Sequence, residues 1–161
     1  MGKFYQVVTE GLCLYAAQLG WFHATPKSSD DLKQKEGQKK LTRAEKITAK
    51  GGTPLMPKIG EESYLLQIWF DLGMVGSGAM GAIQLTAQEI SAWSNLSGVE
   101  LEAWEFACIR KMSAAYLRHM NEGENPDSLP PYGDPINEFD RNVVQKKVVN
   151  AFKAFLQAKK R

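Results

Sequence analysis

The chain has 161 residues and a formal net charge of only +2, with 43% hydrophobic and 24% charged residues. This composition is ordinary for a globular protein, and the length suits one domain with a hydrophobic core rather than two large domains. The small net charge excludes a strongly basic protein that coats nucleic acid. The two cysteines form no CxxC pair, so no disulfide framework is expected. We expect both cysteines to be small core residues of a protein in a reducing cytosol.

Charge is distributed unevenly along the sequence. Residues 27–50 carry eight basic and four acidic residues, whereas residues 59–121 carry three basic and seven acidic ones. Residues 140–161 are the most basic, with seven basic residues and one acidic residue. An acidic middle between basic ends suggests that the ends bind different partners from the middle. An equally weighted alternative is that the lysines only keep solvated surfaces soluble.

The first 60 residues predict a helix, a polar segment and a linker. In residues 3–22 apolar side chains recur every three to five positions, which predicts an amphipathic helix that ends before Pro26. This run is too short and too interrupted to span a bilayer and lacks the features of a signal peptide, which favours the cytoplasm and no membrane partner. Residues 28–50 predict a solvated helix or a disordered segment, and Gly51-Gly52-Thr53-Pro54 predicts a linker.

The middle of the chain predicts three helices, at residues 61–72, 86–97 and 100–121. The second helix should begin at a capping box, Thr86-Ala87-Gln88-Glu89, with a hydrophobic staple around it, and should end at Gly98. Tryptophans on each helix, with a tyrosine on the third, have helical spacing and more often form core than a ligand site.

The end of the chain predicts a proline-rich loop followed by one more helix. Four prolines between residues 122 and 137 forbid a continuous helix there. Residues 138–157 then predict a basic amphipathic helix that docks on a partner, an anionic surface or the protein's own core. Its apolar side is formed by Val144, Val148, Ala151, Phe152 and Phe155.

Together these patterns predict an all-α protein with a small helical bundle core at about residues 60–121, an N-terminal helical arm and a C-terminal basic amphipathic helix. We expect three units in chain order. They are an N-terminal helical and partly disordered arm at residues 1–52, a helical core domain at residues 53–133, and a C-terminal basic helix at residues 134–161.

Two sequence motifs suggest nucleotide or DNA binding, and both lack the required context. Gly76-Ser77-Gly78-Ala79-Met80-Gly81 has the letters of G-x-G-x-x-G, but it follows a predicted helix, and the next helix starts only at Thr86. We therefore predict a flexible loop joining two helices. The third predicted helix opens with three glutamates, which phosphates would repel in a helix-turn-helix reader.

The sequence contains no constellation of residues that supports catalysis. His23 and His119 are isolated from each other and from any nucleophile in sequence, and no HExxH, Walker or GxSxG pattern is present. We therefore predict a binding protein rather than an enzyme, with no catalytic residues, no cofactor and no metal site.

The core segments follow one another in an order that resembles a known family. They are Tyr64-Leu65-Leu66, the glycine-rich loop, Leu85-Thr86-Ala87-Gln88-Glu89-Ile90-Ser91-Ala92-Trp93, Gly98-Val99-Glu100-Leu101, Trp104-Glu105, and Ile109-Arg110-Lys111-Met112-Ser113-Ala114-Ala115-Tyr116-Leu117. This order resembles small helical proteins from the tail-gene cluster of long-tailed bacteriophages, described as tail assembly chaperones. The resemblance covers about residues 54–133. One departure is Ala87, because proteins of this family often have an aromatic residue at the corresponding position.

The resemblance implies a protein that binds tail tube or tape-measure subunits in the host cytoplasm before they polymerise. Such subunits expose apolar surface and sheet edges that would otherwise assemble early. Aromatic residues dominate binding hot spots, so the candidate protein-binding residues are Trp69, Trp93, Trp104 and Tyr116. The core needs most of them, so they cannot all be free to bind.

An alternative function is a phage structural or regulatory protein that contacts nucleic acid weakly and non-specifically through its basic C-terminal helix. The candidate basic patch is Lys146, Lys147, Lys153, Lys159, Lys160 and Arg161. Such binding acts through phosphates and should fall steeply as salt rises.

Overall fold

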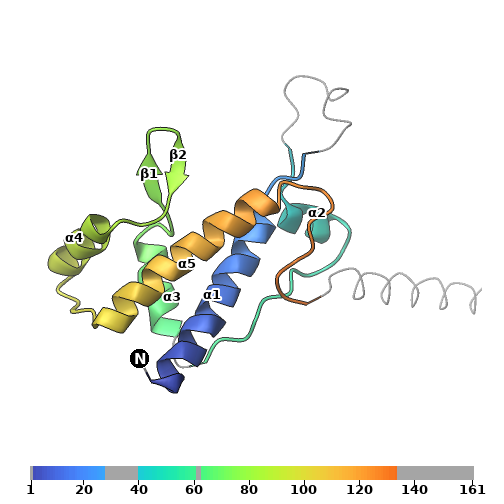
Figure 1. Ribbon diagram of the computed structural model, residues 1–161. Helices are drawn as coiled ribbons and strands as arrows, with labels where there is room; N and C mark the ends of the chain where they lie inside the picture. Colours follow the sequence, from blue (N-terminus) through green and yellow to red (C-terminus); the bar gives the residue numbers. More distant parts are fainter. Residues whose placement is uncertain (1, 28–39, 61–62, 134–161) are drawn as a thin grey trace, which may run out of the picture.

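The computed structural model describes residues 2–27, 40–60 and 63–133. The elements in chain order are α1 (Lys3–His23), α2 (Arg43–Ala49), α3 (Ser63–Asp71), β1 (Gly76–Gly78), β2 (Gly81–Ile83), α4 (Ala87–Ser97) and α5 (Ala103–Glu122). The predicted all-α class is confirmed, because the strands in the described part of the chain form a single short hairpin (Figure 1).

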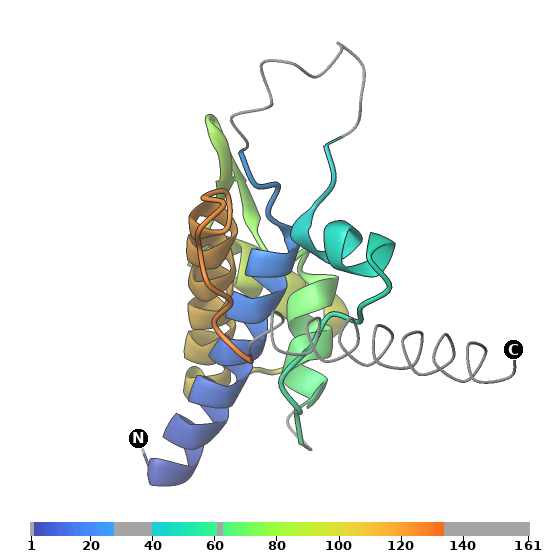
Figure 2. The same ribbon diagram turned by 90° about the vertical axis from the view of Figure 1, so that its right-hand side faces the viewer.

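Helices α1 and α5 are the two long elements and pack side by side, with α3 against the same pair (Figures 1 and 2). Their shared core includes Val8 and Leu12 from α1, Leu65 and Trp69 from α3, and Met112 from α5. Residues 1–52 and 53–133 were predicted as separate units. Whether these units fold independently stays a prediction. In the structure, α1 contributes to the same buried cluster as α3 and α5.

A glycine sets how closely α1 approaches α5. A Cβ atom added at Gly20 would lie 2.2 Å from the carbonyl oxygen of Tyr116. This distance is far inside van der Waals contact, so only a residue without a side chain allows the backbones to approach this closely.

The predicted boundaries of α4 are confirmed in detail. The Thr86 hydroxyl accepts from the Glu89 amide at 3.2 Å, and the Glu89 carboxylate accepts from the Thr86 amide at 2.7 Å. Gly98 ends the helix with a φ of 71°, in the left-handed region that favours glycine. The predicted staple residues, Leu85 and Ile90, are both buried in the main core.

The segment predicted as a flexible loop instead forms an antiparallel hairpin, which corrects that expectation. Gly76 pairs with Ile83, Ser77 with Ala82, and Gly78 with Gly81. Hydrogen bonds from the Thr86 amide and hydroxyl are the main cause of a lowered pKa at Glu89, and a bond from the backbone of Ser77 adds to them. The capping carboxylate therefore also anchors the hairpin to the start of α4.

A second, smaller cluster lies at the end of α1 and includes α2. Trp21 and Phe22 pack with Ile47 of α2. The guanidinium of Arg43 lies 4.2 Å from the centre of the Trp21 ring, and its Nε donates to the carbonyl of Gly123 at 2.8 Å. A capping box between Thr42 and Glu45 starts α2. These contacts join the 40–60 segment to the chain that follows α5.

Candidate protein-binding surface

Two of the four predicted aromatic anchors lie inside the core. Trp69 has no exposed surface, and its indole N–H donates to the carbonyl of Met74 at 2.8 Å. Tyr116 is also buried, and its hydroxyl lies 2.7 Å from Nδ1 of His23. The rings of Trp69 and Tyr116 meet edge to face, with centroids 5.7 Å apart. Neither ring can reach a partner without a local rearrangement, so their direct effect is on stability.

The other two predicted anchors are partly exposed. Trp93 lies on α4 and Trp104 at the start of α5, and both pack against the edge of the main core. The indole N–H of Trp104 donates to the Glu102 carboxylate at 2.7 Å, and its ring packs on that of Tyr5 with centroids 4.6 Å apart. Trp104 is therefore held in a fixed orientation by a stacking partner and a hydrogen bond.

Apolar side chains gather where α1 and α5 both begin, and we call this group the end surface. It consists of Phe4, Tyr5, Val7, Tyr64 and Trp104. Phe4 and Val7 are each 67% exposed, and the Phe4 ring meets Tyr5 edge to face at 5.6 Å. Tyr64 from α3 is 44% exposed, and its hydroxyl donates a hydrogen bond to the Glu105 carboxylate. Phe4, Tyr5 and Trp104 thus form a connected aromatic group, and Val7 and Tyr64 add exposed side chains on α1 and α3.

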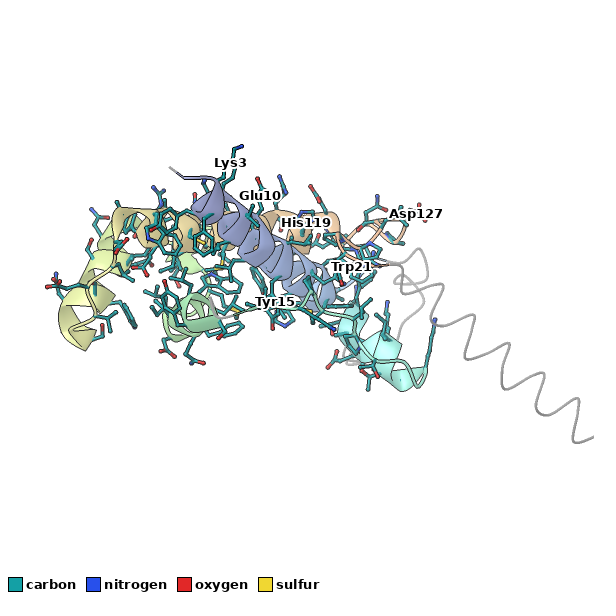
Figure 3. All side chains as sticks on the ribbon, turned by 90° about the horizontal axis from the view of Figure 1, so that it is seen from below. Lys3, Glu10, Tyr15, Trp21, His119 and Asp127 are labelled. Atoms are coloured by element: carbon teal, nitrogen blue, oxygen red, sulfur yellow. The ribbon has the colours of Figure 1, made fainter. Side chains whose placement is uncertain are left out.

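Glutamates border the end surface. Glu100, Glu102 and Glu105 lie at the start of α5, where a helix N-terminus favours negative charge. No lysine, arginine or histidine occurs between Lys58 and Arg110. Lys3, near the start of α1, projects from the same side of that helix as Glu10, while Tyr15 projects from the opposite side (Figure 3). The three glutamates leave this end of the molecule net acidic.

The other end of the α1–α5 pair is closed by polar contacts. Gln18 has no exposed surface, donates to the carbonyl of Leu55 at 3.0 Å and accepts from the Tyr132 amide at 3.0 Å. The Trp21 indole donates to the Ser128 hydroxyl at 2.8 Å, and Figure 3 shows Trp21 at this far end of α1. We call the contacts around Gln18, Gly20, Trp21, His23 and Tyr116 the closed end.

The two cysteine thiols are not activated as nucleophiles. A hollow beside α1 is lined by Gln6, Thr9, Glu10, Cys13 and Lys111. Burial, with a further contribution from Cys108, raises the pKa of the Cys13 thiol to about 11, so this thiol is protonated at neutral pH. Burial also raises the pKa of Cys108. In the ranges that the structure describes, no group of three His, Cys, Asp or Glu side chains is placed to hold a metal ion.

Sequence reasoning placed some of these residues correctly and missed others. In residues 61–72, helical spacing predicts one apolar stripe of Tyr64, Leu65, Ile68, Trp69 and Leu72. The structure instead buries Leu66 and leaves Tyr64 exposed. Phe4 and Val7 belong to the amphipathic helix predicted at residues 3–22. Their three-residue spacing indicates that helix, but it does not indicate that both side chains are exposed. The predicted basic patch, Lys146, Lys147, Lys153, Lys159, Lys160 and Arg161, lies outside the described residues.

Comparison with known proteins agrees with the sequence resemblance. None of the described helices combines the length and apolar character that a bilayer crossing requires. No curated protein and no solved structure matches the chain. Residues 53–118, which span α3, the hairpin, α4 and most of α5, match the family described as phage tail assembly chaperone. This match supports a chaperone role in tail assembly, and over residues 53–118 the chain is similar to the phage tail assembly chaperone family.

Proposed function

We propose that this chain binds a phage tail tube or tape-measure subunit before polymerisation and that the end surface contacts that subunit. The observation that carries the proposal is the exposure of Phe4 and Val7 in the first turns of α1, where Phe4 packs on Tyr5 and the Tyr5 ring packs on Trp104. Burying one such side chain in an interface contributes roughly 1.5–3 kcal/mol. A few of them supply a reversible affinity without a large interface.

The position of the surface also suits reversible masking of a partner. Tyr5 and Trp104 are pre-oriented by stacking, so little side-chain entropy is lost when a partner binds. The surface takes α1 residues from outside the matched range and α3 and α5 residues from inside it. Among the four predicted anchors, Trp104 is thus the one we expect to contact the partner directly, with Trp93 as a second contact on α4.

We propose further that the protein acts in the host cytoplasm and catalyses no reaction. The chaperone description of the family suggests a non-catalytic protein. The protonated state of the Cys13 thiol agrees with that role. Binding of nucleic acid by the basic C-terminal residues stays a prediction, and retention on DNA that falls steeply between low and moderate salt would support it.

Co-expression of this chain with tube and tape-measure subunits of the same phage tests the proposal. One of these subunits should co-purify with the tagged chain, and Phe4→Ser should weaken its recovery. Leu129→Ser is the matched control, because Leu129 is also apolar and is 76% exposed but lies on the segment after α5. Failure of both subunits to bind at micromolar concentration contradicts the proposal, as does equal loss of recovery in the two variants.

A further inference from the structure

The end surface has two properties that together define what fits it. It is apolar and aromatic, and its border is acidic because Glu100, Glu102 and Glu105 lie at the start of α5. An occupant that matches both properties has one apolar side and several positive charges. The charge pattern of the sequence contains such a segment.

Residues 141–161 have this composition. They include seven basic residues and no acidic one. Four of their seven larger apolar residues, Val144, Val148, Phe152 and Phe155, follow one another at steps of four, four and three, which is the spacing of one side of a helix. Lysines lie between these apolar residues and follow them, at positions 146, 147, 153, 159 and 160. In composition this segment complements the end surface in both hydrophobicity and charge.

The chain can carry this segment to the end surface within one molecule. Residues 123–133 run back along α1 towards its start (Figure 2), and the Tyr132 amide is fixed to Gln18 at 3.0 Å. From Gln18 to Phe4 is 14 residues of helix, a distance of about 21 Å. The ten residues from Gly133 to Val143 span up to about 33 Å when extended. The linker is therefore long enough without any rearrangement of the described core.

We propose that residues 141–161 of this chain dock on its own end surface, with their apolar side on Phe4, Val7 and Trp104 and their lysines beside the glutamates of α5. This inference deepens the proposed function, because it makes the same surface a site for which a tail subunit competes. A tethered segment acts at an effective concentration in the millimolar range, so even weak docking covers the surface. The free chain then exposes little apolar surface, and only a tail subunit with sufficient affinity displaces the segment.

Photo-cross-linking in the full-length protein tests the docking directly. Benzoylphenylalanine at position 4 replaces an exposed phenylalanine with a similar aromatic group and reacts with whatever covers the end surface. We expect cross-linked peptides from residues 141–161 in a product with the mass of a single chain. Benzoylphenylalanine at position 129 should give no such peptides, because Leu129 lies outside the end surface.

Charge variants then show whether the acidic border selects the segment. Lys146→Glu with Lys147→Glu should lower the cross-linking yield about two- to tenfold, as expected for two exposed charge pairs. Glu100→Lys, combined with those two changes, should restore part of it. Cross-links only between two chains, or none to residues 141–161, would overturn the inference. Because the experiment contains no tail protein, its outcome is independent of whether the protein binds tube or tape-measure subunits.

Discussion

The two ends of the α1–α5 pair use the same helices for different purposes. At the closed end, Gly20 lets the backbones approach, and Gln18 and Trp21 hydrogen-bond to the segments that cover the helices. At the other end, Phe4 and Val7 are mostly exposed, and Tyr5 of the same turns packs on Trp104. The comparison teaches that a small domain can concentrate its stability in one part of a helix pair and leave aromatic surface free in another.

The largest difference should appear between two tryptophans. Trp69→Ala removes a fully buried indole and should lower the free energy of unfolding by about 3–5 kcal/mol. Trp104→Ala removes a partly exposed indole and should cost clearly less, while weakening partner binding. Urea titration followed by circular dichroism measures both values, and equal losses would contradict the assignment of separate roles.

Two glycines on α1 sharpen the contrast between packed and open positions. Gly20→Ala places a Cβ atom against the Tyr116 carbonyl and should cost about 1–3 kcal/mol through overpacking. Gly11 has no atom within 4 Å of an added Cβ, so Gly11→Ala should stabilise the helix by about 0.5–1 kcal/mol. Thermal unfolding compares the two. A Gly20→Ala variant as stable as the Gly11→Ala variant would show that the helices are not in close contact there.

Helix α4 should depend on its cap more than on its packing. In α4, Ile90 is the one residue classed as buried, so local hydrogen bonds contribute a large share of its stability. Thr86→Ala removes the hydroxyl that accepts from the Glu89 amide and should cost about 1 kcal/mol. Thr86→Ser keeps the hydroxyl and is the matched control. Hydrogen exchange of the α4 amides should speed up in the first variant only.

The smallest effect is a pH dependence confined to the closed end, where both histidines lie. Burial lowers the pKa of His23, and burial lowers that of His119 against the opposing charge of Glu122. The folded state therefore binds protons less readily than the unfolded chain, and stability present above about pH 6.5 should fall as pH drops below that value. His23→Gln should reduce this fall in Tm between pH 7.5 and 5.0. An unchanged slope would contradict the assignment.

Local signals explain what the sequence could predict. The capping box at Thr86 and Glu89 and the stop at Gly98 depend on spacing alone, so they were predictable, as were the helices around them. The hairpin was missed because Gly76, Gly78 and Gly81 carry no side chains from which alternation could be read. The hairpin also contacts the Glu89 carboxylate through the backbone of Ser77, and Glu89 lies outside the motif.

The end surface could not be predicted, because exposure depends on how far one helix extends past another. The pattern of α1 places Phe4 and Val8 in one periodic stripe, yet Val8 is buried and Phe4 is 67% exposed. Which turns of α1 are covered depends on where α5 begins, and the predicted start at residue 100 differs from the observed start at Ala103. Similarly, the spacing in α3 assigns Tyr64 to the apolar stripe, whereas the structure buries Leu66 instead.

The most direct measurement is the dissociation constant of the tail subunit for paired surface variants, determined by calorimetry. Phe4→Ser with Val7→Ser should weaken binding at least about tenfold, because burying each side chain contributes roughly 1.5–3 kcal/mol and about 1.4 kcal/mol corresponds to a factor of ten. Met80→Ser with Leu129→Ser removes two apolar side chains that are more exposed than Phe4 and Val7 but lie outside the end surface, and it should leave the constant nearly unchanged. Equal weakening by the two pairs, with unchanged Tm in both, would contradict the claim that the end surface is the binding site.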